Sequence, residues 1–212
     1  MGACKEIELK VIPAKIANEF VRKHHYSGSV VLNSFLHFGA FLNKELHGVL
    51  QFGPSLDKSK VIGLVEGTGW NEFCELNRMA FDDKLPRNSE SYCIGKALRL
   101  IKKNAPHIKW VISFADGCSC GDGTIYRASN FVLTQIKKNT SMWIDKDGNK
   151  LQDLSINLNP NINKKDLTRL EGYMFRYIYF IDKKSRAKLT CEEIPFSRIQ
   201  ELGVGMYKGQ KR

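Results

Sequence analysis

Apolar residues recur along the chain in short runs separated by polar turns, a pattern that predicts several strands and a few helices. Residues 110–115 form such a run, which is typical of a buried strand. Residues 92–104 differ, because their apolar side chains follow the i, i+3, i+4, i+7 spacing of an amphipathic helix: Ile94, Ala97, Leu98 and Ile101. The two patterns together indicate a sheet with helices packed against it.

The same patterns predict the remaining elements. Strands are expected at residues 7–12, 35–42, 46–52, 73–81, 110–115, 131–137 and 175–182. Helices are expected at residues 13–23, 92–104 and 124–129, and Pro13 suits a first helical turn. Residues 43–45 have the spacing of a hairpin loop. Because strands and helices alternate, we expect the α/β (α+β) class, with a mixed central β-sheet flanked by helices.

The length of 212 residues suits one large domain with extensions. We expect a catalytic domain over residues 1–182. Residues 138–172 are polar and read as an irregular insertion or lid, apart from a turn at Asp145-Lys146-Asp147-Gly148. Residues 183–212 read as a basic C-terminal extension.

The balance of charge favours a polyanionic partner. Thirty-three Lys and Arg against 22 Asp and Glu give a net charge of +11, which suits DNA, RNA or a phosphorylated cofactor, although it also aids solubility. Candidate contacts to a nucleic-acid backbone are basic residues of the amphipathic helix and of the C-terminal extension: Lys96, Arg99, Lys103, Lys183, Lys184 and Arg186. A solvated helix face is the alternative for the first three.

The longest apolar runs are far too short to span a bilayer, and the N-terminus lacks the apolar core of a signal peptide. We therefore expect a cytoplasmic protein that is not bound to a membrane.

A polar ten-residue turn, residues 82–91, joins a predicted strand to the amphipathic helix. The first N–H groups of a helix have no partner within it and coincide with the positive end of its dipole, so this turn suits a phosphate or carboxylate ligand. Arg87 adds a positively charged guanidinium group to this turn, and Asn88, Ser89 and Ser91 lie beside it. The alternative is an ordinary helix cap at Asn88 or Ser89.

Three further groups of residues can carry chemistry. His25 and Tyr26 follow the first predicted helix, where His25 is a candidate base or metal ligand, or else one of a His pair that favours the helix dipole. On the strand at residues 73–81, alternation places Arg78 on the same side as Leu76, with Glu75, Asn77 and Met79 on the other side. An Arg within a strand needs a partner, and Asp116 is a candidate.

Asp116 itself stands at the C-terminal end of a predicted central strand, where open α/β sheets gather their ligands. Tyr126 lies in the first turn of the next helix, and Asn130 can adopt the left-handed conformation that ends it. A structural Asp-Gly turn is the alternative for Asp116, and core packing is the alternative for Tyr126.

These segments resemble GNAT acyltransferases. The run Ile125-Tyr126-Arg127-Ala128-Ser129-Asn130-Phe131 resembles the Leu-Tyr-x-x-x-Gly-Phe pattern of that fold, with Asn130 in place of Gly. In GNAT enzymes the Tyr often protonates the departing thiolate. The usual Gly-rich pyrophosphate signature is replaced here by Arg87-Asn88-Ser89-Glu90-Ser91.

A closer resemblance covers residues 14–138, which are similar to the Mom DNA-modification proteins of Mu-like phages. It rests on ordered motifs: His25-Tyr26-Ser27-Gly28, Glu75-Leu76-Asn77-Arg78, Leu85-Pro86-Arg87-Asn88-Ser89-Glu90-Ser91, Ser113-Phe114-Ala115-Asp116-Gly117 and Ile125-Tyr126. The resemblance implies a GNAT-like, phage- or prophage-encoded enzyme that acts in the host cell. It would convert the N6 amino group of adenine in DNA to a carbamoylmethyl form and so shield phage DNA from restriction.

The resemblance also implies functional positions and a donor. His25, Tyr26, Asp116 and Tyr126 would be catalytic, and Arg78, Arg87, Asn88, Ser89 and Ser91 would bind the donor. Iron has been suggested for the family, with His25 and Asp116 as ligands here. The added atoms correspond to a glycyl residue, which makes glycyl-tRNA a candidate donor beside acetyl-CoA. The adenine base would be flipped out or single-stranded. A conventional N-acetyltransferase and a non-catalytic DNA-binding protein are the alternatives.

Overall fold

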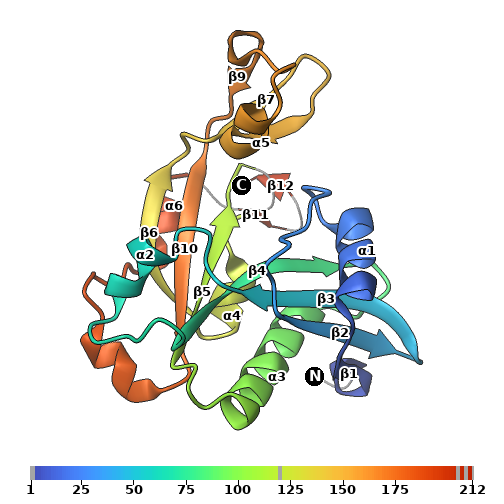
Figure 1. The fold of residues 1–212 in the computed structure, drawn as a ribbon, viewed down its shortest axis with the longest axis vertical. Helices are drawn as coiled ribbons and strands as arrows, with labels where there is room; N and C mark the ends of the chain where they lie inside the picture. Colours follow the sequence, from blue (N-terminus) through green and yellow to red (C-terminus); the bar gives the residue numbers. More distant parts are fainter. Residues whose placement is uncertain (1–2, 119–120, 204–205, 208–209, 212) are drawn as a thin grey trace.

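The main sheet has seven strands in the part of the chain that the computed structural model describes, namely residues 3–118, 121–203, 206–207 and 210–211 (Figure 1). Its order is β1-β2-β3-β4-β5-β10-β6, and all neighbours pair antiparallel except β4 and β5. The strands are β1 (Glu8–Val11), β2 (Leu36–Leu42), β3 (Glu45–Gly53), β4 (Phe73–Phe81), β5 (Trp110–Asp116), β6 (Val132–Lys138) and β10 (Tyr173–Phe180). The mixed central sheet expected from the sequence is confirmed.

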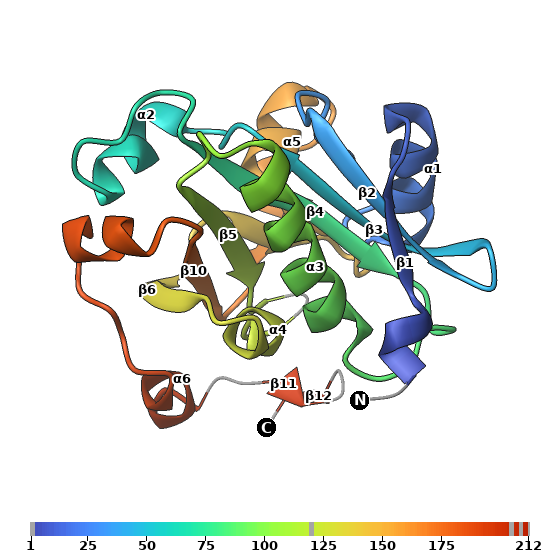
Figure 2. The same cartoon turned by 90° about the horizontal axis from the view of Figure 1, so that it is seen from below.

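The helices divide between the two faces of this sheet (Figure 2). On one face lie α1 (Ala14–His24), α2 (Lys58–Val61) and the 3-10 turn η2 (Ile62–Leu64). On the other lie α3 (Ser89–Asn104), α4 (Thr124–Ala128) and α6 (Ser197–Glu201). We call these the α1 face and the α3 face. Of the helices that the structure describes, none is long and apolar enough to cross a bilayer.

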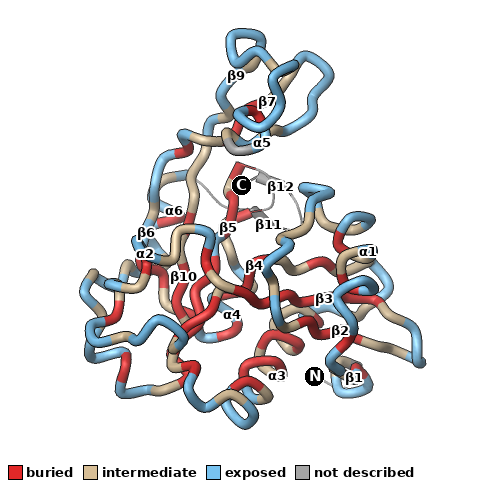
Figure 3. The backbone as a smooth tube through the Cα atoms, in the orientation of Figure 1, coloured by how far each residue is buried: buried red, intermediate tan, exposed pale blue. Residues whose placement is uncertain are grey.

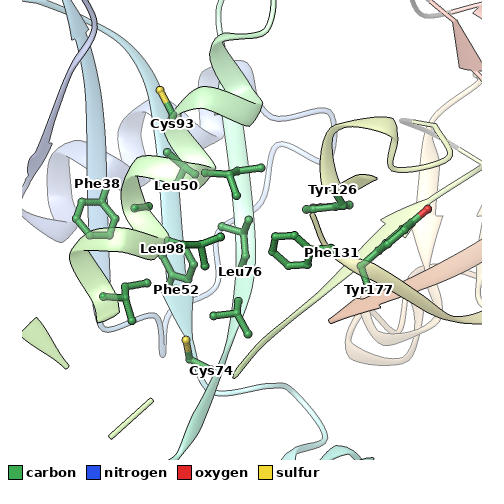
Figure 4. Packing of buried hydrophobic residues seen from close by; sticks show 14 of the residues in the cluster. Phe38, Leu50, Phe52, Cys74, Leu76, Cys93, Leu98, Tyr126, Phe131 and Tyr177 are labelled. Carbon is green, nitrogen blue, oxygen red and sulfur yellow. The ribbon is translucent and has the colours of Figure 1, made fainter. Parts of the chain in front are cut away.

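The largest apolar cluster lies between the sheet and α3. Leu98 of α3 lies there beside Leu76 of β4, and Cys93 of α3 belongs to the same cluster, which Phe131 and Tyr177 extend toward α4 (Figure 4). A smaller cluster fills the space under α1, and another lies under α2 and η2, where the rings of Phe73 and Trp110 stack at 4.3 Å. The buried parts of the chain accordingly follow the strands and the inner side of α3 (Figure 3).

Two turns explain where elements begin and end. The hairpin between β2 and β3 is shorter than the expected 43–45, because Asn43 and Lys44 both have positive φ angles, of 51° and 69°. Two left-handed residues match the twist of a tight hairpin. Helix α3 begins at Ser89 rather than near residue 92, because Asn88 takes a left-handed φ of 71° directly before it.

Residues 138–172 differ from the irregular segment expected. They form a small three-stranded sheet, in the order β8-β7-β9, which stands apart from the main sheet at the top of Figure 1. Its elements are β7 (Met142–Ile144), β8 (Lys150–Gln152), α5 (Asp153–Leu158), the 3-10 turn η3 (Lys164–Asp166) and β9 (Thr168–Arg169). Trp143 is buried and donates from Nε1 to Asp153 at 2.7 Å. Asp145 accepts from the backbone N–H of Asp147 and Asn149, as the expected turn requires.

The basic extension packs against the main domain over most of its described length. The 3-10 turn η4 (Lys183–Lys188) leads to Leu189, which pairs with Val65, and Ile194 pairs with Leu133. Ile199 of α6 is buried in the cluster under α3. Two short strands, β11 (Met206–Tyr207) and β12 (Gln210–Lys211), pair near the end, and a 3-10 turn, η1 (Ala3–Glu6), begins the fold. Of the basic residues in the extension, Lys208 and Arg212 lie outside the described residues.

Candidate active site

The parallel strands β4 and β5 separate soon after they begin. They pair only at Phe73–Glu75 and Trp110–Ile112. At the next position the hydroxyl of Ser113 donates to the carbonyl oxygen of Leu76 at 3.1 Å, in place of a backbone bond. Beyond this point the two strands diverge, so the C-terminal half of each presents residues to a gap between them. The sequence-predicted site residues lie on or around these two strand ends.

A bulge at Asn77 corrects the expected alternation along β4. The pairing with β3 shifts between Leu76 and Arg78, so Asn77 has no direct partner on β3. Leu76 and Met79 therefore both pack on the α3 face, whereas Arg78 shares the α1 face with Ala80. The prediction that Arg78 lies beside Leu76 is wrong, because strict alternation does not allow for an inserted residue.

Asn77 uses its position in the bulge to hold two loops. Its side-chain oxygen accepts from the hydroxyl of Ser34 at 2.9 Å, and its amide nitrogen donates to the carbonyl oxygen of Pro54 at 3.2 Å. Arg78, the next residue, contacts the same loop: its Nε donates to the carbonyl oxygen of Ser29 at 3.0 Å. The loop that follows α1 is thus tied to β4 by two consecutive side chains.

That loop carries His25 and Tyr26, as the sequence predicted. Helix α1 ends at His24, and Gly28 takes a left-handed φ of 58° that turns the chain. Nδ1 of His25 lies 2.8 Å from the hydroxyl of Ser27, and the rings of His25 and Tyr26 are 4.3 Å apart. Tyr26 is 51% exposed. The structure therefore gathers His25, Tyr26 and Arg78 into one group.

Burial and charge determine how this group titrates. Burial, with a smaller contribution from the positive charge of Arg78, lowers the pKa of His25 to about 4. Burial also lowers the pKa of Arg78, and the charges of Tyr26 and Glu75 oppose that shift. Burial raises the pKa of Glu75, although Ser55 and the backbone of Leu56 form hydrogen bonds with it. Glu75, rather than the expected Asp116, is the carboxylate whose charge acts on Arg78.

Asp116 ends β5 and is buried. One carboxylate oxygen accepts from the backbone N–H of Cys118 at 2.8 Å. The next residue, Gly117, donates its N–H to the carbonyl oxygen of Tyr173 at 2.9 Å, and a Cβ there would lie 2.5 Å from that oxygen. By alternation from Ile112, which packs under α2 and η2, Asp116 lies on the α1 face, as Arg78 does.

Tyr126 lies on the opposite face. It is 7% exposed, within the cluster under α3, and its ring centroid is 5.4 Å from that of Phe131 and 5.2 Å from that of Tyr177. Asn130 has a φ of 63°, which ends this short helical segment as the sequence predicted. The packing predicted as the alternative for Tyr126 is therefore present, and its catalytic role stays a prediction.

The turn before α3 also lies on the α3 face. Ser89 is buried, and both its N–H and its hydroxyl donate to the carbonyl oxygen of Pro86, so it is occupied within the turn. Ser91 donates its hydroxyl to the carbonyl oxygen of Asn88 at 3.1 Å. The first helical bond runs from Tyr92 to Asn88, so the N–H groups of Glu90 and Ser91 precede it, with the exposed Arg87 nearby. These donors suit a phosphate oxygen, although Glu90 adds a negative charge in the same turn.

A metal site at His25 and Asp116 finds no further support. Among the described residues, no group of three or more His, Cys, Asp or Glu side chains is placed to hold a metal ion. Two ligands alone do not make an iron site of the kinds that proteins use. Within the described part of the chain, the side chains at His25 and Asp116 therefore do not supply the ligand set of an iron ion.

The predicted DNA-contacting residues differ in availability. Arg99 and Lys103 are exposed on α3, whereas Lys96 is half-buried and donates to the carbonyl oxygen of Ile7 at 2.9 Å. Lys183 and Lys184 are exposed. Arg186 is paired with Glu193 through two bonds, of 2.6 and 2.5 Å. Of the three basic residues of α3 expected to contact DNA, Arg99 and Lys103 are therefore the two that are exposed.

Comparison with known proteins decides the family. A model of the Mom protein family matches residues 6–198 of the chain. The chain belongs to the Mom family. It is 34% identical over 197 residues to "Methylcarbamoylase mom" of Escherichia phage Mu, and the match covers 89% of this chain and 81% of that protein. The family relationship confirms an acyltransferase-like enzyme and the resemblance inferred from the ordered motifs.

Solved structures show the same fold for this Mom protein. The spermidine/spermine N-acetyltransferase SpeG from Vibrio cholerae aligns with a TM-score of 0.53 and 8% identity, over 88% of this chain and 99% of that one. Arabidopsis thaliana NAA60 aligns with a TM-score of 0.52 and 10% identity, over 82% and 97% of the two chains. At such identities the likeness shows the fold alone, and it confirms the GNAT-like class.

Sequence reasoning on this Mom protein missed three residues that shape the site. Asn77 and Ser113 set the bulge and the strand separation, and Glu75 supplies the charge near Arg78. Glu75 and Asn77 lie within the Glu75-Leu76-Asn77-Arg78 motif, so their polar character inside an apolar strand was the available signal. Ser113 carried a similar signal, as a polar residue in the middle of a buried strand.

Proposed function

We propose that this protein acylates the N6 amino group of adenine in DNA and yields the carbamoylmethyl form, which protects phage DNA from restriction. The observation that carries the proposal is the separation of β4 and β5, with one group of site residues on each face of the sheet. Family membership and the name of the phage Mu relative support the same reaction.

The two groups suit the two substrates. On the α3 face, the turn with Arg87 and Ser91 precedes α3, and α3 contacts α4, which carries Tyr126. This side would hold the activated donor, with its phosphates at the helix N-terminus. On the α1 face, His25, Arg78 and Asp116 would receive the adenine. The acyl group would then pass through the gap between the strands.

The donor is proposed to be an activated glycyl group, such as glycyl-tRNA, rather than acetyl-CoA. The carbamoylmethyl group contains one nitrogen that an acetyl group lacks. Attack of the adenine N6 on the glycyl carbonyl would form a C–N bond, break the ester C–O bond and release the carrier hydroxyl. The glycyl amine would next attack purine C6 and close a five-membered ring. Cleavage of the original C6–N6 bond, with transfer of one proton from the attacking amine to the released amide nitrogen, would give the carbamoylmethyl isomer without gain or loss of atoms.

Proton transfers can be assigned to side chains of the site. The adenine amine is a weak nucleophile, so a base must remove its proton as the bond forms. With a pKa of about 4, the ring of His25 is neutral near pH 7. The backbone N–H of Ser27 donates to Nδ1 of His25 at 3.2 Å. The neutral ring therefore carries its proton on Nε2 and would act as a donor, which leaves Asp116 as the candidate base. Arg78 would steady the carbonyl oxygen, and Tyr126 would protonate the leaving group.

Mass spectrometry of nucleosides tests the proposed reaction. DNA from bacteria that express the protein should contain a modified deoxyadenosine with the mass of the carbamoylmethyl form, and Asp116→Asn should abolish it. An acetyl mass instead would favour a conventional acetyltransferase. Unmodified nucleosides, together with retained DNA binding, would favour a non-catalytic DNA-binding protein.

A second experiment tests the donor. Purified protein and DNA are incubated with labelled glycyl-tRNA and, separately, with labelled acetyl-CoA. Label should enter adenine only from glycyl-tRNA, and entry only from acetyl-CoA would contradict the glycyl donor.

A further inference from the structure

Phe114 is unusually exposed for its place in the fold. It lies in β5, between β4 and β10 of the main sheet, and its neighbours Ser113 and Ala115 are buried. Phe114 itself is 39% exposed. A large apolar side chain in the middle of a sheet is normally covered by a helix or loop of the protein.

The explanation is that the apolar clusters on the α1 face end before they reach Phe114. The cluster under α2 and η2 includes Trp110 and Ile112, the two preceding residues of β5 on that face. The cluster under α1 includes Val49 and Ala80, on β3 and β4. Phe114 belongs to neither cluster. The C-terminal half of β5 is therefore left without a helix to pack against.

Polar and basic side chains surround Phe114 on this face. Register places Arg176 of β10 directly opposite Phe114, and Met174 opposite Asp116. Gln135 and Lys137 of β6 follow, opposite Arg176 and Met174, and both are exposed. Nε and Nη2 of Arg176 donate to Thr134 at 3.0 and 3.1 Å, which fixes the plane of its guanidinium. We call Phe114, Gln135, Lys137, Met174 and Arg176 the open face, and the buried Asp116 adjoins it two residues further along β5.

We propose that the open face binds the target adenine nucleotide, with the base stacked on the ring of Phe114. Phe114 and Asp116 are two positions apart on one face of a strand, a separation of about 7 Å. A purine stacked on the ring can thus direct its exocyclic amine toward Asp116. Arg176 and Lys137 supply positive charge for the phosphates beside that nucleotide. This inference rests on the proposed function, since it names the acceptor site of that reaction.

Nucleic acid is the occupant that the open face fits best. The apolar side chains of the open face are the ring of Phe114 and the partly buried Met174, which are too small an area for a hydrophobic protein interface, whereas one ring is enough to stack one base. The net charge of +11 and the cations of β6 and β10 complement a phosphate backbone. The face is also continuous with Asp116, so a base stacked there is already at the candidate active site.

Fluorescence of 2-aminopurine tests the stacking. A single-stranded oligonucleotide of mixed sequence, with one 2-aminopurine in place of adenine, is titrated with the protein. Binding should quench the fluorescence, because the base stacks on Phe114. Phe114→Ala should abolish the quenching and weaken binding about 5- to 150-fold, the range expected for loss of one stacked base. Phe114→Tyr should behave like the wild type.

Trp70→Ala provides the matched control. Trp70 is 57% exposed and aromatic, but it precedes β4, at the end of the sheet away from Asp116. The Trp70→Ala variant should bind the oligonucleotide and quench its fluorescence as the wild type does. Equal binding by Phe114→Ala and the wild type, or an equal loss in Trp70→Ala, would overturn the proposal. Because Phe114 is 39% exposed, its truncation also removes some packing within the sheet, so binding is compared only where thermal unfolding shows each variant fully folded, which separates stacking from folding.

Quenching of 2-aminopurine does not require the enzyme to turn over. A negative result in this assay is therefore distinct from a negative result for the proposed reaction. Two results together would support the base-binding site and refute the proposed reaction: the wild type leaves nucleoside masses unchanged, and Phe114→Ala loses the quenching that the wild type shows. Wild-type modification of DNA with unchanged binding by Phe114→Ala would refute the base site alone.

Discussion

The guanidinium of Arg78 donates from Nε to the backbone carbonyl oxygen of Ser29 at 3.0 Å, across 49 residues of sequence. A second bond, from Nη1 to the carbonyl oxygen of Asn77 at 2.8 Å, fixes the same guanidinium to its own strand. The loop that carries His25 and Tyr26 is therefore held in place by a charged side chain of β4. Replacing Arg78 should change both the position of that loop and the charge near His25.

Arg78→Gln should raise the pKa of His25. The positive charge of Arg78 disfavours protonation of the ring, and burial accounts for the larger part of the shift, so the pKa should rise without reaching its ordinary value. NMR titration of the His25 ring protons measures this. Arg22→Gln is the control, since Arg22 is exposed on α1 and is not among the charges that act on His25. An unchanged pKa in Arg78→Gln would refute the electrostatic coupling.

His25→Gln should make stability less dependent on pH. The pKa of His25 falls from 6.5 to about 4 on folding, so the unfolded chain binds a proton at a higher pH than the folded one. The wild type should therefore lose stability as the pH falls from above 6.5 toward 4, and His25→Gln should lose less. Urea unfolding across this range measures the difference. His107→Gln, at an exposed position, should follow the wild type.

Asn77→Ala should destabilise the fold by about 1–3 kcal/mol, the cost of leaving buried hydrogen-bond partners unpaired. The change removes the partners of both Ser34 and the carbonyl oxygen of Pro54. Urea unfolding gives the magnitude. Asn161→Ala, at an exposed position, should stay within about 0.5 kcal/mol of the wild type. Equal effects of the two substitutions would mean that Asn77 does not hold the loops.

Gly117→Ala should destabilise the fold and impair the site together. A Cβ at this position would lie 2.5 Å from the carbonyl oxygen of Tyr173, so the backbone after Asp116 must move. Strain of this kind costs about 1–3 kcal/mol. Unfolding measurements and nucleoside mass spectrometry check the two effects. Gly63→Ala has open space around its Cβ and should be close to neutral in both assays.

Salt dependence distinguishes the basic residues of α3. If Arg99 and Lys103 contact DNA phosphates, substituting either by Ala should reduce the slope of log affinity against log salt by about 1. Lys96→Ala should leave that slope unchanged and weaken the contact between α3 and the residue before β1, because its ammonium donates to the carbonyl oxygen of Ile7. Equal slopes for the wild type and Arg99→Ala would remove this helix from the DNA interface.

The sequence predicted the main elements because their apolar periodicity is long enough to read. Seven strands and the helix at α3 were identified, and the ordered motifs indicated the family. The bulge at Asn77 was not predicted, since alternation assumes that no residue is inserted. The small sheet within residues 138–172 was missed because its strands have only two or three residues, too few to show a period.

The candidate site was predicted in part. His25 and Tyr26 stand on the expected loop, and Asp116 ends the expected strand. The division of these residues and Tyr126 between two faces was not predicted, because the position of a face depends on packing between elements far apart in sequence. For the same reason, the apolar run at residues 110–115 predicts a buried strand throughout, whereas Phe114 within it is exposed.

The short contact between β4 and β5 also has a mechanical consequence. In the part of the sheet that the structure describes, three residue pairs join β4 to β5. The Ser113 hydroxyl adds one bond after them, and the N–H of Lys109 donates to the carbonyl oxygen of Glu72 before them. Among the described strands of the main sheet, this junction has fewer paired residues than any other, so the sheet is expected to flex most readily here. A hinge at this line would let the enzyme widen its opening for a bulky carrier molecule and narrow it again around the two reactants.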